Sequence, residues 1–383
     1  MSIAIKLGAR LLYRVDPVPG ESPRGYLCRV AHTHAYGGPL SLAQIAGLPV
    51  SGLEIDEGAK QIAHVLRLDA EEWRAMCYQH IKGRKRFRQR LFCGQRISAD
   101  DLNYKRPRIC PACLKRNPIW WAVWDLGLVT ACRIHRCLLV NRCPACQRGL
   151  AWQRPAVHKC RCGLDLRDLS PEGADREMVA INAAICRAAG FSVAHLAELD
   201  LTECNFPPEM LTLRLGSLLR LILFVGSIRE KDRLRRKQRP LAATNIGAAT
   251  EIDRAAATVL RDWPKPFREI LRCMLPLETE NLATLNFNDI FGNFYRHLFR
   301  ILPRSEFGFP ARDLRAVCHR GLEGLDPWPA SLLLACRSTE VLLGYGERGG
   351  KDGTDGGWTC FGSGSSRPKF TAYSGAHQGA GAY

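Results

Sequence analysis

The stretch from Cys110 to Cys146 reads CPACLKRNPIWWAVWDLGLVTACRIHRCLLVNRCPAC and carries the tetrapeptide Cys-Pro-Ala-Cys at both ends. Such a tetrapeptide can be a redox dithiol, half of a disulfide or a pair of metal-binding thiolates. Here each copy is followed by a second close pair of Cys or His residues. The first copy is followed after eighteen residues by Cys132-x-x-His135, and the second after thirteen by Cys160-x-Cys162. This repeated arrangement indicates two metal sites.

Two close pairs joined by a loop can supply the four ligands of a tetrahedral zinc site. We predict two structural zinc ions, because four protein ligands leave no open position for water or substrate. The predicted ligands are Cys110, Cys113, Cys132 and His135 in the first site, and Cys143, Cys146, Cys160 and Cys162 in the second. Cys137 and His158 are further candidates that could replace one of them.

The redox and disulfide alternatives fit less well. A thioredoxin-type site uses one such motif at the start of a helix, whereas here the motif recurs with partner pairs. The N-terminus lacks a signal-peptide cleavage pattern, so we expect a cytoplasmic protein, in which disulfides are rare. The most apolar run, residues 210–225, contains two arginines and is shorter than the roughly 20 residues of a membrane span. We therefore expect no membrane partner.

The chain is strongly basic, with 55 Lys and Arg against 37 Asp and Glu and a net charge of +18. Residues 82–116 contain twelve Lys or Arg and two Asp, which gives this stretch a net charge of +10. Such runs are often a solvated face, but this concentration favours contact with nucleic-acid phosphates. The predicted contact residues are Arg84, Lys85, Arg86, Arg88, Arg90, Lys105, Arg106, Arg108, Lys115 and Arg116.

The remaining sequence predicts a mainly α-helical protein. Residues 1–105 would form a helix-turn-helix-like domain with a basic linker, 106–170 the tandem zinc modules, 171–343 a C-terminal helical domain and 344–383 a disordered tail. Expected N-terminal helices start at Ser22-Pro23 and Ser41, cover about residues 57–68, and follow a capping box of Asp69 and Glu72. These short helices also suit any small helical bundle.

In the C-terminal part, apolar spacing predicts helices over residues 211–222, 247–262 and 287–302. The last 40 residues contain twelve of the 34 glycines and show no apolar period, which predicts disorder. A frame-shifted or truncated end would have the same composition. Between the ligand pairs, Trp120, Trp121 and Trp124 could stack nucleotide bases, but we favour a role in the core of the zinc modules.

These motifs together resemble the TniQ family of transposition proteins. The similarity rests on Ile109–Leu114, Trp124, Leu128–His135, Leu138-Leu139, Arg142–Cys146 and Cys160–Leu166, and on the opening motif Glu21-Ser22-Pro23-Arg24-Gly25-Tyr26-Leu27. It covers roughly residues 15–170. The Gly-rich end departs from the family, whose members usually continue with helical sequence.

The resemblance implies a non-catalytic target-selection subunit in the bacterial cytoplasm, associated with the nucleoid. Its implied partners are DNA, an AAA+ ATPase regulator, the transposase complex, in some members a CRISPR effector complex, and a second copy of the chain. The residues agree with a non-enzyme, because no acidic cluster for a nuclease is recognisable and the segment GERGGKD at 346–352 lacks the P-loop pattern. A general zinc-containing DNA-binding regulator and a protein–protein adaptor without direct DNA reading remain alternatives.

Overall fold

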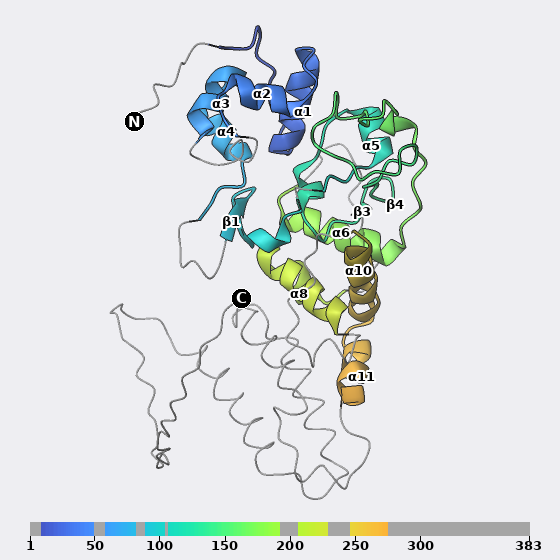
Figure 1. Ribbon diagram of the computed structural model, residues 1–383. Helices are drawn as coiled ribbons and strands as arrows, with labels where there is room; N and C mark the ends of the chain where they lie inside the picture. Colours follow the sequence, from blue (N-terminus) through green and yellow to red (C-terminus); the bar gives the residue numbers. More distant parts are fainter. Residues whose placement is uncertain are drawn as a thin grey trace, which may run out of the picture.

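The computed structural model describes residues 9–49, 58–81, 89–103, 106–191, 206–228 and 246–274. Within these ranges the chain is mainly helical and has two short antiparallel hairpins (Figure 1). The N-terminal helices are α1 (Pro23–Thr33), α2 (Pro39–Ile45), α3 (Ala59–Leu66) and α4 (Ala70–Met76). The middle part comprises β1 (Gln89–Phe92), β2 (Gln95–Ser98), η3 (Ala99–Asp101), α5 (Pro111–Arg116), η4 (Ala122–Asp125), β3 (Ala131–Cys132), β4 (Cys137–Leu138) and η5 (Leu166–Asp168). The C-terminal helices are α6 (Arg176–Ala188), α7 (Pro208–Leu211), α8 (Leu215–Ser227), α10 (Ile246–Arg261) and α11 (Lys265–Met274).

Helices α1 to α4 pack around their own apolar core, shown in blue in Figure 1. Tyr26, Leu42, Ile62 and Trp73 are fully buried in this core. The predicted capping box is confirmed at the start of α4, where the backbone N–H of Asp69 donates to the Glu72 carboxylate at 2.9 Å. The helical nature of this region is therefore as expected, and its use as a DNA-reading helix-turn-helix stays a prediction.

The start of α1 packs directly on residues 106–170, here called the cysteine-rich region. Ser22 occupies the N-cap position, but its hydroxyl donates to the Asp125 carboxylate at 2.6 Å and does not cap the helix. Its backbone N–H donates to the Trp120 carbonyl at 2.7 Å. A Cβ atom at Gly25 would lie 2.3 Å from the Cβ of Trp120, so only glycine allows this close approach.

Part of the predicted basic linker folds as a hairpin that the sequence reading did not predict. Strand β1 pairs with β2 in the register Gln89↔Ser98 to Phe92↔Gln95. The turn residues Cys93 and Gly94 both have positive φ, which matches the twist of a two-residue hairpin turn. Strand β2 lies against α8, where a Cβ at Gly216 would come within 2.6 Å of the Arg96 carbonyl oxygen.

A second apolar core runs from this hairpin through the cysteine-rich region into α6, α8, α10 and α11. Trp120 and Trp124 belong to it, with exposed fractions of 0% and 4%, and their rings meet at a centroid distance of 5.9 Å. Trp121 is half-buried and lies edge-on to Phe191. The expected core role is confirmed for Trp120 and Trp124, whose faces are covered and cannot stack on a base.

The C-terminal helices follow the apolar pattern of the sequence. Helix α10 spans Ile246–Arg261, close to the predicted 247–262, and packs mainly against α8 and α6. The leucines predicted to share one face are divided between α7, which holds Leu211, and α8, which holds Leu215 and Leu218. The segment 287–302 and the Gly-rich tail 344–383 lie outside the described residues. In the part of the chain that is described, none of the helices has the length and hydropathy needed to cross a membrane.

Candidate metal centres

The first candidate centre forms where a helix start meets a hairpin. Cys110 is the N-cap residue of α5, and Cys113 lies one turn later in the same helix. Cys132 ends strand β3, and the turn that follows places His135 opposite the two cysteines of α5. Arg136 adopts a positive φ of 51° at the end of this turn, and its N–H donates to the Cys132 carbonyl at 2.9 Å.

The second candidate centre is built from two tight turns. In the first turn, the N–H of Gln147 donates to the Cys143 carbonyl at 2.9 Å and Gln147 itself adopts a positive φ of 55°. In the second, Gly163 adopts a φ of 94° and its N–H donates to the Cys160 carbonyl at 3.0 Å. Positive φ values at these positions let the chain reverse so that both thiols of each pair face the same point.

The distances between the ligand atoms fit a tetrahedral metal site. In each group of four, the ligand atoms all lie within 4.8 Å of one another. The sulfurs are 3.6 Å apart in the pair Cys113–Cys132, 3.7 Å in Cys143–Cys162 and 3.8 Å in Cys146–Cys160. Four sulfurs at about 2.3 Å from one zinc ion would be about 3.8 Å from each other. A disulfide would require about 2.05 Å, and these cysteines are all free.

The structure thus brings together the eight residues predicted as ligands, in the two predicted groups. In the first group, the Nδ1 atom of His135 lies 3.4 Å from the Cys110 sulfur and 3.2 Å from the Cys113 sulfur. Three thiolates and one imidazole, or four thiolates, are the ligand sets that structural zinc uses. The donor chemistry therefore fits zinc at both positions.

The two leftover candidates occupy different places. The Cys137 sulfur lies 3.7 Å from the Cys110 sulfur, at the edge of the first group but outside its four members. The ring of His158 meets the ring of His32 edge-on at 5.7 Å and belongs to neither group. His135 therefore belongs to the first group of four, and Cys137 lies beside this group as the alternative ligand.

The surroundings lower the thiol pKa of one cysteine in each group and raise it for others. Hydrogen bonds from the thiols of Cys113 and Cys132 hold the pKa of Cys110 well below its usual range. Burial raises the pKa of Cys143, but the backbone N–H groups of Cys146 and Ala145 oppose this effect, and the net result is a pKa of about 7. The hydrogen bonds with Cys110 raise the pKa of Cys113 and bring that of Cys132 to about 12, and burial raises the pKa of Cys160 to about 12. A thiolate is the form that binds a metal ion, so in the absence of metal only one thiolate in each group is favoured.

A buried polar network holds the strand that carries Cys132. The side-chain oxygen of Asn182 on α6 accepts from the N–H groups of Thr130 and Ala131, at 2.8 and 3.2 Å. The Asp253 carboxylate on α10 accepts from the Thr130 hydroxyl at 2.5 Å and from the Asn182 amide at 3.2 Å. Burial raises the pKa of Asp253 to about 7, although these hydrogen bonds and nearby Arg108 oppose the shift.

The prediction that Arg108 contacts nucleic acid is wrong. Its side chain is fully buried, and its Nη1 donates to the carbonyls of Gly127 and Val129, both at 2.8 Å. Burial lowers its pKa to about 10, while the nearby carboxylates Asp253 and Asp125 oppose the change. Arg108 braces the loop between η4 and β3 because its guanidinium satisfies two buried carbonyl groups.

The other predicted contact residues are divided between the surface and the undescribed segments. Arg106, Lys115 and Arg116 are exposed beside α5, and Arg90 is half-buried on β1. Five further predicted residues lie outside the described part of the chain: Arg84, Lys85, Arg86, Arg88 and Lys105.

Sequence reasoning missed a second buried network, which ties the N-terminal helices to the cysteine-rich region. The Asp125 carboxylate accepts from the hydroxyls of Ser22 and Tyr78, at 2.6 and 2.5 Å. Burial raises the pKa of Asp125 to about 6 against the effect of these two bonds. Buried Glu21 accepts from the Arg29 guanidinium at 2.8 and 2.6 Å and forms a backbone bridge with Trp121.

The comparison with protein families gives one match, over about the first third of the chain. The TniQ family model matches residues 12–139. This part of the chain is a TniQ domain. The resemblance drawn from the sequence motifs is therefore confirmed. The TniQ match includes the N-terminal helices and the whole first candidate metal centre, while Cys143, Cys146, Cys160 and Cys162 lie beyond it. No curated protein matches the chain.

The TniQ domain explains the opening motif in structural terms. Glu21, Ser22, Gly25 and Tyr26 are all buried, and each contacts a neighbouring segment. Tyr26 donates from its hydroxyl to the Val15 carbonyl at 2.7 Å. This TniQ motif therefore joins the helices to the cysteine-rich region. TniQ is a family of non-catalytic accessory proteins, so the match indicates a transposition-associated protein.

Proposed function

We propose that this chain is a non-catalytic accessory protein of DNA transposition that selects the target site and recruits an AAA+ ATPase and the transposase. The observation that carries the proposal is the TniQ match over residues 12–139. Zinc at both centres would be structural, because each group supplies four protein ligands and leaves no position for a reacting water. Metal binding would then stabilise the part of the chain that joins the N-terminal and C-terminal helices.

Direct contact with DNA is the second part of the proposal. It is supported by the net charge of +18 and by the exposed side chains of Arg106, Lys115 and Arg116. Arg84, Lys85, Arg86 and Arg88, in the same basic stretch of the sequence, would add to the attraction for phosphates. Because each neutralised phosphate releases counterions, the affinity for duplex DNA should fall steeply with salt.

The test is the salt dependence of duplex DNA binding by the full-length protein, together with recovery of an AAA+ ATPase from the native host. Reversing the charges of Arg84, Lys85, Arg86 and Arg88 together should lower both the DNA affinity and the slope of affinity against salt. The matched control reverses four exposed charges elsewhere, at Lys159, Arg176, Arg254 and Lys265. An equal loss in both variants would mean that only net charge matters and would contradict a defined contact stretch.

The same experiment separates the alternatives. A chain that does not bind duplex DNA at low salt but still recovers the ATPase is a protein–protein adaptor, as expected for recruitment by an RNA-guided complex. A chain that binds DNA but recovers neither the ATPase nor the transposase is a general DNA-binding regulator. Either result would overturn the proposed combination of roles.

A further inference from the structure

A pocket beside the second candidate metal centre is lined by three arginines. It has a volume of about 130 Å³, whereas a single buried water needs roughly 10–15 Å³ by this measure. Its lining residues are Cys146, Arg148, Gly149, Leu150, Ala151, Arg154, Cys160, Arg161 and Cys162. Within the described part of the chain, no Asp or Glu lines this pocket. The pocket therefore concentrates positive charge without a carboxylate to balance it.

Arg154 lines the pocket, where the charged groups or thiols that act on its guanidinium are Cys28 and Cys160 and not a carboxylate. Its exposed fraction is only 2%, and its Nε, Nη1 and Nη2 atoms have no hydrogen-bond partner among the described residues. Its guanidinium lies 4.6 Å from the ring centre of Trp120, which orients the group but does not satisfy its N–H donors. An unpaired buried guanidinium carries a large desolvation cost, so a bound anion would stabilise it.

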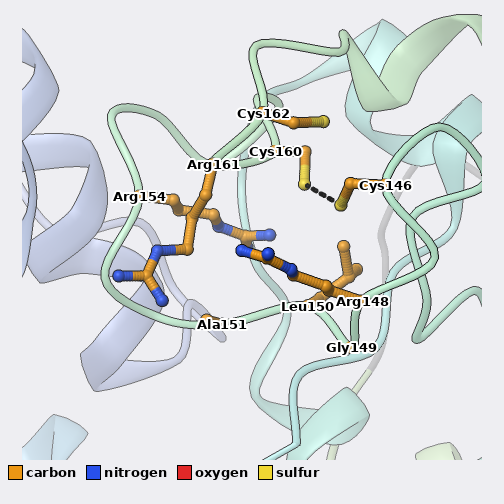
Figure 2. Close-up of a pocket in the computed structure, with 9 residues that line it drawn as sticks. All are labelled: Cys146, Arg148, Gly149, Leu150, Ala151, Arg154, Cys160, Arg161 and Cys162. Carbon is orange, nitrogen blue, oxygen red and sulfur yellow. Dashed lines mark hydrogen bonds between the residues drawn. The ribbon is translucent and has the colours of Figure 1, made fainter.

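The two other arginines lie at the exposed rim. In Figure 2 the guanidinium groups of Arg148 and Arg154 point toward each other below the sulfurs of Cys146 and Cys160. Arg161 extends down the other side of the pocket, with its guanidinium directed away from the sulfurs.

The negative charge of the second metal centre does not neutralise all of the positive charge of the three arginines. A zinc ion with four thiolates has a net charge of 2−, and three arginines bring 3+. One positive charge would therefore remain even with the second centre loaded. The Cys28 thiol, which donates to the Arg154 carbonyl at 3.8 Å, is neutral and offers no negative charge.

We propose that Arg148, Arg154 and Arg161 bind a phosphate group of the nucleic-acid backbone. Guanidinium groups match the oxygens of a phosphate with paired N–H donors, so Arg148 and Arg154 would hold the anion while Arg161 adds positive charge at the rim. The choice of nucleic acid as the source of the phosphate rests on the proposed DNA contact, whereas the pocket's affinity for phosphate does not.

The first test uses inorganic phosphate and the full-length, metal-loaded protein. Phosphate should raise the melting temperature of the wild type, because it binds the folded state only. The double variant Arg148→Glu, Arg161→Glu should lose this increase and weaken phosphate binding by at least about tenfold. The control Lys159→Glu reverses an exposed charge on the same loop outside the pocket and should keep it. An equal increase in wild type and double variant would overturn the proposal.

The second test asks whether the charge of Arg154 serves to bind phosphate or to balance the negative charge of the cysteine thiolates. Arg154→Met keeps an unbranched side chain on Trp120 but removes the buried charge. This variant should retain its zinc, melt no lower than the wild type without phosphate, and fail to respond to phosphate. If it loses zinc instead, the charge of Arg154 serves the metal centre and the proposal is wrong.

The third test identifies the source of the phosphate. The Arg148→Glu, Arg161→Glu variant should bind duplex DNA more weakly, with a salt slope that is smaller by about one phosphate. If phosphate binding is lost but DNA affinity is unchanged, the pocket serves a free phosphate compound or a phosphopeptide, and the nucleic-acid assignment is overturned. If the wild type binds phosphate but no DNA, the proposed function fails while the phosphate site itself remains.

Discussion

Replacing Asn182 by Ala tests whether the C-terminal helices hold the first metal centre in place. The Asn182 side chain on α6 accepts from two backbone N–H groups, those of Thr130 and Ala131, which directly precede Cys132. It also donates to the Met178 carbonyl at 2.9 Å and to Asp253. The residue is completely buried, so water cannot replace these partners.

The expected loss follows from the groups that the substitution leaves unpaired. Each buried donor or acceptor without a partner costs about 1–3 kcal/mol, so two backbone N–H groups give about 2–6 kcal/mol. This is a large part of the roughly 5–15 kcal/mol by which a typical domain is stable. The loosened strand should also release metal faster, because Cys132 is its last residue.

Urea unfolding measures the first effect, and the rate of zinc transfer to a coloured chelator measures the second. Thr258→Ala on α10 is the control, since its exposed hydroxyl donates only to the carbonyl of the preceding turn. We expect the control to change the unfolding free energy by less than about 0.5 kcal/mol. A similarly small change for Asn182→Ala, with unaltered zinc release, would refute the claimed link between α6 and the metal centre.

Three further predictions concern the cores and the ligands. Cys113→Ser and Cys146→Ser should each lose one zinc ion and unfold only the module that holds this ion, seen as reduced tryptophan fluorescence, whereas Cys93→Ser at an exposed turn should change neither; a ligand variant that keeps both zinc ions would contradict this. Burial raises the pKa of the Asp253 carboxyl to about 7 from an ordinary value of 3.8, so the folded state binds this proton more tightly than the unfolded state does. The unfolding free energy should therefore fall by about 4 kcal/mol as the pH rises from about 4 to 7. Asp253→Asn should remove this difference in urea titrations, and identical pH profiles would disprove it. Trp120→Ala should cost about 3–5 kcal/mol in the same assay, because the side chain is fully buried, and a loss below 1 kcal/mol would contradict its place in the core.

The ligand groups could be predicted because each half of a site is local in sequence. A Cys-x-x-Cys turn places two sulfurs close together by backbone geometry alone. Because the motif occurs twice and each copy is followed by a second pair of Cys or His residues, the sequence also shows which two pairs form each site. Choosing between His135 and Cys137 needed the structure, since both follow Cys132 closely and only the turn at Arg136 decides which side chain faces Cys113.

The buried networks could not be predicted, because their members are far apart in the chain. Asn182 and Asp253 look like ordinary polar residues of amphipathic helices, and Thr130 is 123 residues from Asp253. Arg108 looked like one more member of a basic run. Its neighbour Ile109 is buried and bridges to Val140, and this pairing draws Arg108 into the core. A charge count over a window cannot detect such burial.

The β1–β2 hairpin shows the same limit at shorter range. The pair Cys93-Gly94 is a weak turn signal, and each four-residue strand buries only one side chain, Phe92 or Ile97, which is too few to show an alternating pattern. Only the packing of β2 on α8 makes the hairpin part of the core. The mainly helical character could therefore be predicted from the sequence, whereas the contacts that join the parts of the fold could not.

The central claim is that two four-ligand centres, one inside the TniQ match and one directly after it, hold structural zinc. Elemental analysis of the full-length protein, purified without added metal and shown to be folded by circular dichroism, tests this claim most directly. We predict two zinc ions per chain, falling to one when Cys146 is replaced by Ser and the first centre is left intact. A folded protein that contains no zinc or other metal would contradict it.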